Sequence, residues 1–154
     1  MSERSRPTRR DYVAWRTATT RWADDDVYGH MNNAAYFELI DTAVNAHLIE
    51  AGVDVRSLPA IGIVAEVSCR YFEELGFPAP VEIGLVTERV GTSSIVYRIG
   101  LFQGEPPGDA GDQPANAEGR FVHVYVDNTV REGRRPVVPI PSEVRAVVER
   151  LTPH

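Results

Sequence analysis

The stretch Arg21-Trp-Ala-Asp-Asp-Asp-Val-Tyr-Gly-His-Met-Asn-Asn-Ala-Ala-Tyr36 joins an acidic turn to the start of a long apolar helix. Asn32 or Asn33 can cap that helix, because a side-chain oxygen there accepts from free backbone N–H groups. Apolar positions then recur every three or four residues until Gly52 supplies a stop. We therefore predict a helix over residues 33–51. Its apolar face comprises Phe37, Ile40, Val44, His47 or Leu48, and Ala51.

The segments after this helix are rich in β-forming residues. We predict strands over 61–71, 81–90, 93–102 and 120–126, a first strand around 15–22 and a short edge strand over 137–140. Gly91-Thr92 is typical of a tight turn, and a short helix begins near Pro141 with Ser142 as its cap. One long helix and a run of antiparallel strands indicate an α+β fold, with the sheet curled around the helix.

Length and composition favour one domain over residues 13–154 of the 154-residue chain. We expect residues 1–12 to form a disordered basic tail and the Pro/Gly-rich residues 104–117 to be a flexible connector. No apolar run approaches the ~20 residues that a membrane span needs. The N-terminus also lacks the apolar core of a signal peptide, so we expect a cytoplasmic protein without membrane contact.

Charge and cysteine content limit which ligands the protein can bind and which covalent links it can form. The formal net charge of -6 disfavours bulk nucleic-acid binding. All 16 basic residues are arginine, so a phosphate would be bound by arginine or by backbone donors. Cys69 is the single cysteine, so no intrachain disulfide forms, and we assign it a packing role in a strand.

The acidic turn carries the chemistry. Asp24, Asp25 and Asp26 suit a solvated turn, but Gly29 permits a sharp bend and a helix start follows at once. The start of a helix offers unpaired N–H groups and about half a positive charge. A thioester or ester carbonyl could be polarised there while an Asp attacks it or activates water. One such donor is typically worth about 10²–10³ in rate.

Other chemistries fit less well. A calcium loop counted from Asp24 would need Glu at its twelfth position, where this chain has Ala35. No histidine pair has zinc-ligand spacing, so we predict no metal site. His30 is the histidine beside the acidic turn, either as a base or as a residue that orients the loop. Neither a Gly-x-Ser-x-Gly elbow nor a Gly-rich phosphate loop occurs.

These residues together resemble the hot-dog fold acyl-CoA thioesterases of the 4-hydroxybenzoyl-CoA thioesterase type. The resemblance extends through the helix, the hairpin near residues 89–94 and the segment 135–141. It implies an antiparallel sheet of about five strands wrapped around a long central helix. The matching motif is Arg21 followed by Asp24-x-Asp26-x-x-Gly29-His30-x-Asn32-Asn33-x-x-Tyr36.

The resemblance assigns roles to particular residues. Asp26 would act as nucleophile or general base on a thioester carbonyl, with the backbone N–H of Asn33 polarising that carbonyl. One branch of the family has a His at the position of Asn33. The catalytic role of that His does not carry over, because this chain has Asn there. His30 would orient the loop.

Substrate binding is implied in less detail. Arg89 and Ser93 are placed where the family binds CoA phosphates, although neighbouring Val90 and Gly91 carry no charge. No separate cofactor is implied, because CoA is part of the substrate. The residues expected at the substrate pocket are Gly29, Tyr36, Val64 and Ser68.

Self-association as a homodimer or homotetramer is also implied, with active sites at the subunit interface. Three other functions stay open on the same fold. The protein could bind acyl-CoA without catalysis, or act on an acyl carrier protein thioester. A dehydratase would need a His base, and only His30 is near. The sequence does not name the acyl group.

Overall fold

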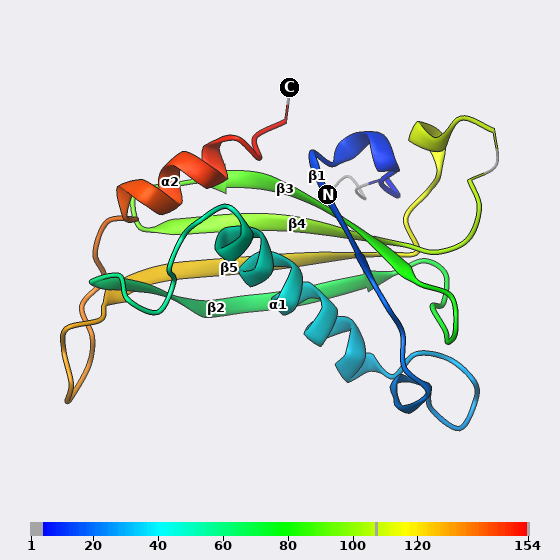
Figure 1. Ribbon diagram of the computed structural model, residues 1–154, viewed down its shortest axis with the longest axis horizontal. Coiled ribbons are helices and arrows are strands. Elements are labelled where there is room, and N and C mark those ends of the chain that lie inside the picture. The colour runs from blue at the N-terminus through cyan, green and yellow to red at the C-terminus, as the bar shows by residue number, and fades with distance from the viewer. Residues whose placement is uncertain (1–4, 107, 154) are drawn as a thin grey trace.

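The computed structural model describes residues 5–106 and 108–153. Five strands, two α-helices and three short 3₁₀ turns follow one another along these residues (Figure 1). The strands and α-helices are β1 (Ala14–Ala18), α1 (Asn33–Glu50), β2 (Ala60–Tyr71), β3 (Val81–Val90), β4 (Ser94–Phe102), β5 (Ala117–Asp127) and α2 (Ser142–Glu149). Neither α-helix has both the length and the apolar character needed to span a membrane.

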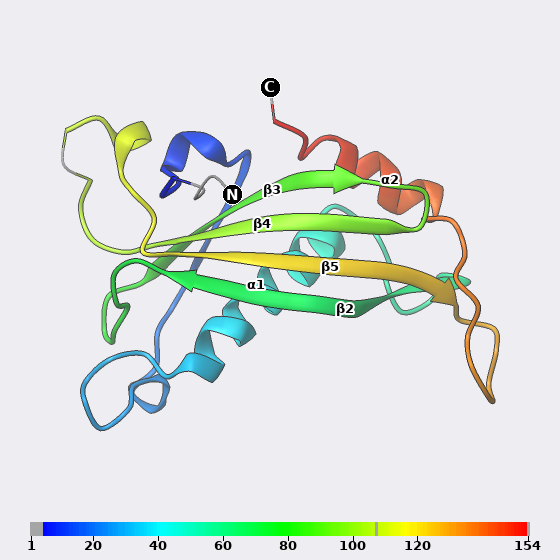
Figure 2. The same cartoon turned by 180° about the vertical axis from the view of Figure 1, so that it is seen from behind.

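The five strands form one antiparallel sheet in the order β1-β3-β4-β5-β2. Helix α1 lies against one face of this sheet, in front of the strands in Figure 1 and behind them in Figure 2. The predicted α+β arrangement of a sheet around a long helix is therefore confirmed. Among the described residues strand β2 pairs only with β5, so its other edge has no partner strand there.

Helix α1 begins and ends where its capping residues predict. Asn32 is the N-cap, and its side chain accepts from the N–H of Ala34 at 2.9 Å. Gly52 follows the helix with φ +95°, a conformation that favours glycine. Phe37 is less buried than its spacing suggests. The buried residues are Ala35, Tyr36, Ile40, Ala43, Val44 and Leu48.

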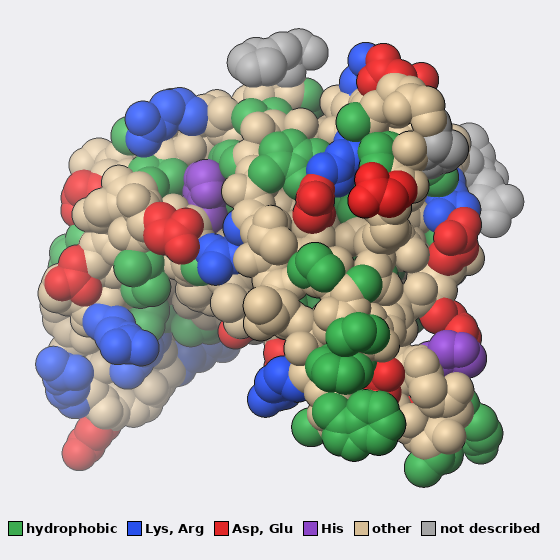
Figure 3. Space-filling model, turned by 45° about the vertical axis from the view of Figure 1, so that its right-hand side comes forward, with side chains coloured by type: hydrophobic (Ala, Val, Ile, Leu, Met, Phe, Trp, Pro, Cys, Tyr) green, Lys and Arg blue, Asp and Glu red, His purple; other side chains and the backbone are tan. Residues whose placement is uncertain are grey.

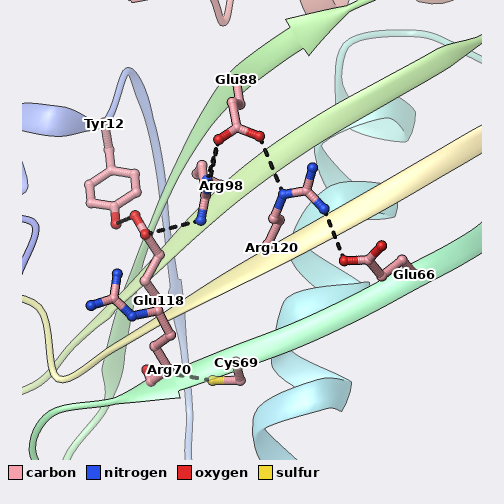
Figure 4. Close-up of polar contacts among 8 residues, drawn as sticks. All are labelled: Tyr12, Glu66, Cys69, Arg70, Glu88, Arg98, Glu118 and Arg120. Atoms are coloured by element: carbon pink, nitrogen blue, oxygen red, sulfur yellow. Dashed lines mark hydrogen bonds and ion pairs between the residues drawn. The ribbon is translucent and has the colours of Figure 1, made fainter. Parts of the chain in front are cut away.

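The strand register defines two faces of the sheet. A Cβ at Gly119 would lie 2.5 Å from Ile40 of α1, so Gly119 and its partner Cys69 face the helix. Arg120 is the next residue and therefore points to the outer face, with its partners Arg98 and Ser68. Figure 4 shows that this outer face carries linked ion pairs. They are Arg98–Glu88, Arg98–Glu118, Arg120–Glu88 and Arg120–Glu66.

The disorder predicted for the basic tail is not found in residues 8–12, while residues 1–4 lie outside the described part of the chain. Residues Arg9–Asp11 form a 3₁₀ turn, and Tyr12 is buried. The ring of Tyr12 covers the paired Gly84 and Gly100, and its hydroxyl donates to Glu118 at 2.5 Å. This packing depends on two distant glycines, which local composition does not reveal.

Two other segments also differ from expectation. The segment 104–117 was predicted to be a flexible connector, but its second half packs against the rest of the protein. Gln113, Ala115 and Asn116 are buried there. Strand β5 consequently starts earlier than the predicted 120–126.

The C-terminal region differs as well. The edge strand predicted over 137–140 reduces to one isolated bridge between Val126 and Val137. Helix α2 has Pro141 as its N-cap, so Ser142 is the first helical residue and not the cap. The fixed φ of proline suits a helix start, which explains the shift by one residue.

Candidate active site

The candidate site lies in the loop between β1 and α1, at the lower right of Figure 1. The backbone turns tightly here. The N–H of Asp26 donates to the carbonyl of His30 at 2.8 Å, and the N–H of Gly29 donates to the carbonyl of Asp26 at 3.1 Å. Gly29 has φ +79°, which a side chain would strain. This turn delivers the chain directly to the N-cap of α1.

The structure separates the three aspartates that the sequence places together. Asp24 is buried, and its carboxylate accepts three hydrogen bonds from Arg21, at 2.7, 2.8 and 3.0 Å. These hydrogen bonds lower the pKa of Asp24. Asp25 accepts from the N–H of Phe77 at 3.2 Å. Both residues therefore hold the loop in place.

Asp26 is the exposed member of the three. Its Oδ1 accepts from the N–H groups of Tyr28 and His30, at 2.9 and 3.3 Å. Both bonds end on Oδ1, so the second oxygen, Oδ2, is not held by them. An oriented carboxylate with one oxygen available is suited to attack a carbonyl or to accept a proton from water.

The start of α1 supplies donors close to this carboxylate in sequence. The side-chain oxygen of Asn32 accepts from the N–H of Ala34, and its backbone carbonyl accepts from the N–H of Ala35, each at 2.9 Å. Neither bond uses the N–H of Asn33, the first residue of the helix. The first N–H groups of a helix have no intrahelical partner, so that of Asn33 is suited to a negatively charged oxygen.

A tyrosine from β2 holds the first residue of the helix. The hydroxyl of Tyr71 donates to the side-chain oxygen of Asn33. Its ring meets that of Tyr36 edge to face, with centroids 4.9 Å apart. Burial raises the pKa of Tyr71 to about 12, so its hydroxyl stays protonated and can donate at neutral pH. The end of β2 thereby fixes the helix start.

His30 bonds away from the carboxylate. Its Nε2 lies 2.6 Å from Oε2 of Glu74, in the loop that follows β2. This contact ties the acidic loop to a second segment of the chain. A side chain engaged in this way is suited to orient the loop.

The predicted pocket residues do not come together within one chain. Gly29 is exposed in the loop, whereas Tyr36 is 4% exposed and accepts from the N–H of Leu75 at 3.1 Å. Tyr36 thus belongs to the core beneath the site. Val64 lies seven residues from Tyr71 along β2, which is about 20 Å along the strand.

Ser68 is the clearest departure from the expected pocket. Even spacing along a strand predicts that Val64 and Ser68 face the same side. A bulge between Val64 and Glu66 shifts the register, so Val64 pairs with His123 on the α1 face and Ser68 pairs with Arg120 on the outer face. Ser68 therefore lies on the face away from α1, the same face as its register partner Arg120.

Arg89 and Ser93 are also distant from Asp26 within the chain. They lie at the turn between β3 and β4, at the end of the sheet opposite the acidic loop (Figure 1). Arg89 is exposed, and the carbonyl of Ser93 accepts from the N–H of Tyr125 at 2.8 Å.

Apolar side chains surround the acidic loop on the surface. Figure 3 shows a group of exposed hydrophobic side chains at the lower edge of the molecule. The loop region contributes Trp22, Val27 and Tyr28, which are 79%, 93% and 79% exposed. Trp22 also meets Phe77 edge to face, with centroids 6.0 Å apart. Exposed apolar residues beside a polar site commonly mark a contact with a ligand or partner.

A separate cavity of about 490 Å³ lies between the second half of α1 and strands β2 and β5. A volume of this size is ordinary for a small-molecule site. No group of three or more potential metal ligands occurs among the described residues. The cavity is lined by Asp41, Asn45, Ile49, Gly62, His123 and Tyr125, among others.

The sequence did not assign a role at the site to three residues of this region, Tyr71, Glu74 and His123. Tyr71 and Glu74 hold Asn33 and His30, but both contacts cross long stretches of chain. His123 could have been placed by strand alternation, because it shares a face with Phe121 and Tyr125 in β5. That alternation predicts the face but not the cavity.

An antiparallel sheet around a long helix defines a hot-dog fold protein, and the acidic loop with its exposed Asp26 carboxylate leads directly into the capped start of that helix. The chain belongs to the thioesterase-like superfamily, whose model matches residues 20–148. It is accordingly a thioester hydrolase of this superfamily.

Several solved structures share this fold. The PA5185 protein from Pseudomonas aeruginosa strain PAO1 is 41% identical, with a TM-score of 0.83, over 97% of this chain and 98% of that one. A gentisyl-coenzyme A thioesterase is 20% identical, with a TM-score of 0.70, over 86% and 99%. A 4-hydroxybenzoyl CoA thioesterase is 15% identical, with a TM-score of 0.74, over 88% and 97%. At these low identities, the two thioesterase structures show only that their fold is similar to that of this chain. Among curated protein sequences, none matches this chain.

Proposed function

We propose that the protein hydrolyses acyl-CoA thioesters, with Asp26 as nucleophile or general base. The observation that carries this proposal is the exposed Asp26 carboxylate, held by two backbone N–H groups beside the start of α1. Neighbouring Asp24 and Asp25 are engaged in holding the loop, which leaves Asp26 as the available carboxylate.

The geometry suggests how the reaction would proceed. The N–H of Asn33 would donate to the thioester oxygen and stabilise the negative charge that develops on it. Oδ2 of Asp26 would either attack the carbonyl carbon or take a proton from an attacking water. The carbon–sulfur bond breaks, the acyl group gains the oxygen of water, and a proton passes to the CoA sulfur. An anhydride with Asp26 forms on the way only if Asp26 is the nucleophile.

Pairing of β2 with a second copy would complete the site. The open edge of β2 exposes several apolar side chains, and an unpaired edge is a template for another strand. Antiparallel pairing about a two-fold axis would place the Tyr71 end of one copy beside the Ala60 end of the other. The cavity of the second copy would then lie near Asp26. The exposed side chains are Ile63, Val64, Val67 and Tyr71.

The same pairing would make the predicted contacts of CoA with Arg89 and Ser93 possible. It would turn the β3–β4 turn of the second copy, with Arg89 and Ser93, toward the Asp26 end of the first. CoA would then bind between two subunits of a homodimer, which could pair further into a homotetramer.

A panel of acyl-CoAs with thiol detection tests this proposal. Asp26→Asn should lower kcat by about 10³-fold, because general bases typically contribute 10²–10⁴. Asp25→Asn is the matched control, since the Asp25 carboxylate accepts from the N–H of Phe77 and this variant should keep most of the turnover. Near-wild-type turnover in Asp26→Asn would show that the catalytic assignment is wrong.

Two alternatives have their own outcomes in this experiment. Tight acyl-CoA binding without release of thiol by the wild-type protein would identify a non-catalytic sensor. Turnover of acyl carrier protein thioesters, without turnover of the matching acyl-CoAs, would identify a carrier-protein thioesterase. The Asp26 carboxylate beside an available N–H favours catalysis, because binding alone requires no such carboxylate.

A further inference from the structure

The imidazole of His123 forms part of the cavity wall, yet its Nδ1 lacks a hydrogen-bond partner. The side chain is 3% exposed and lies in β5. Its Nδ1 is buried without a hydrogen bond to any described residue. Leaving such a buried polar atom unpaired typically costs about 1–3 kcal/mol, so its presence at a cavity wall calls for an explanation.

Its surroundings are built around the ring. Phe121 and Tyr125 flank the imidazole, with centroids at 4.7 and 6.2 Å. On the neighbouring strand, Gly62 lies against it, and a Cβ there would come within 3.0 Å of Nδ1. Both Gly62 and His123 line the cavity, so the missing side chain at position 62 leaves the imidazole beside the cavity. The ring is therefore fixed in position.

The charge state restricts what the ring can bind. Burial lowers the pKa of His123 to about 4, so the imidazole is neutral at pH 7. A neutral imidazole has one nitrogen that donates and one that accepts. A hydroxyl can both donate and accept, so it can pair with either nitrogen. A ligand carboxylate would lose its hydration here without gaining a positively charged imidazole as its partner, so its binding is disfavoured.

We infer that His123 is a specificity-determining residue, which selects acyl groups carrying a neutral hydroxyl that reaches the cavity wall. The inference rests on the proposed function, since it takes the cavity to hold the acyl part of a CoA thioester. The apolar wall would contact the carbon skeleton, and the imidazole would bind its hydroxyl. Both hydroxylated alkyl and hydroxylated aromatic acyl groups offer this chemistry.

Matched substrate pairs test the inference and separate the two sources. The pairs are 3-hydroxybutyryl-CoA with butyryl-CoA, and 4-hydroxybenzoyl-CoA with benzoyl-CoA. We expect the wild-type kcat/KM to favour the hydroxylated member of at least one pair by tenfold or more. His123→Phe should lower that preference about tenfold or more, because the ring stays and the hydrogen bond is lost.

His47→Phe is the matched control. His47 is a partly buried histidine that lies outside the cavity, so its replacement should leave the preference unchanged. Equal rates within both pairs for the wild type, or the same preference in His123→Phe and wild type, would overturn the inference.

A measurement on the wild-type protein keeps the test independent of folding and of turnover. The ¹⁵N shifts of the His123 imidazole would be followed while 4-methylphenol or toluene is added. A shift with 4-methylphenol that toluene does not cause supports the inference, and equal effects of the two contradict it. Absence of hydrolysis for every CoA thioester would instead refute the proposed function, while this comparison would still decide the role of His123.

Discussion

The two halves of α1 serve different purposes. The loop that leads into its N-terminal end carries the exposed carboxylate of Asp26, and the capping bonds of Asn32 leave the first N–H of the helix, that of Asn33, unused. Its C-terminal half borders a cavity of about 490 Å³ with a neutral histidine in the wall. The acidic loop lies at the first end, whereas the cavity that holds His123 lies at the second. The comparison leads to the proposal that a complete site takes one end from each of two copies.

The largest effect expected concerns the cavity end and its neutral histidine. The folded pKa of His123 is about 4, below the ordinary value of about 6.5. Between these values the unfolded chain binds a proton that the folded chain does not. The free energy of unfolding therefore falls as pH drops from 6.5 toward 4, by about 3 kcal/mol for this group.

Urea unfolding at several pH values would check this dependence. His123→Phe should flatten it between pH 6.5 and 4. Burial also lowers the pKa of His47, so His47→Phe is needed to separate the two contributions. If the stability of His123→Phe falls with pH as steeply as that of wild type, the histidine is not buried neutral.

The next effect concerns the strand edge that would bring the two ends together. Val67 is 37% exposed on β2, and an Asp there would place a charge in the proposed interface. Val67→Asp should yield a monomer by sedimentation velocity and lower kcat/KM by about 100-fold, because Asp26 loses its cavity. Val137→Asp is the control, since Val137 is 60% exposed and lies outside β2. A fully active monomer would break the comparison between the two helix ends.

A smaller effect concerns the tyrosine that holds the reactive end. Tyr71→Phe removes the hydroxyl that bonds Asn33 and keeps the ring against Tyr36. We expect kcat to fall about tenfold with little change in KM, since a misplaced N–H weakens only the stabilisation of charge in the transition state. Unchanged kcat would mean that the helix start is held without Tyr71.

The two ends were not equally predictable from sequence. The N-terminal end depends on local chemistry: Asn32 caps the helix, Gly29 allows the turn, and both act within a few residues of Asp26. The cavity end depends on contacts between distant segments. The bulge near Val64 reverses the face of Ser68, and no local pattern marks it.

The same distinction explains the other departures. Tyr12 is ordered because Gly84 and Gly100 leave room for its ring, and the three residues meet only in the folded sheet. The hairpin of β3 and β4 was predictable because a tight turn and two β-rich runs adjoin one another. Elements set by neighbouring residues follow from the sequence, whereas those set by the packing of distant residues do not.

Subunit complementation tests the central claim most directly. Asp26→Asn removes the carboxylate, and Ala46→Trp fills the cavity, which Ala46 lines. Each variant alone should be inactive. Co-expressed and purified together through two tags, they should form dimers in which one of the two sites has both intact parts. Because the two tags retain only mixed dimers, each with one intact site of two, recovery of roughly half of the wild-type activity is predicted. No recovery from a mixture shown to contain both chains in one dimer would contradict a site shared between subunits.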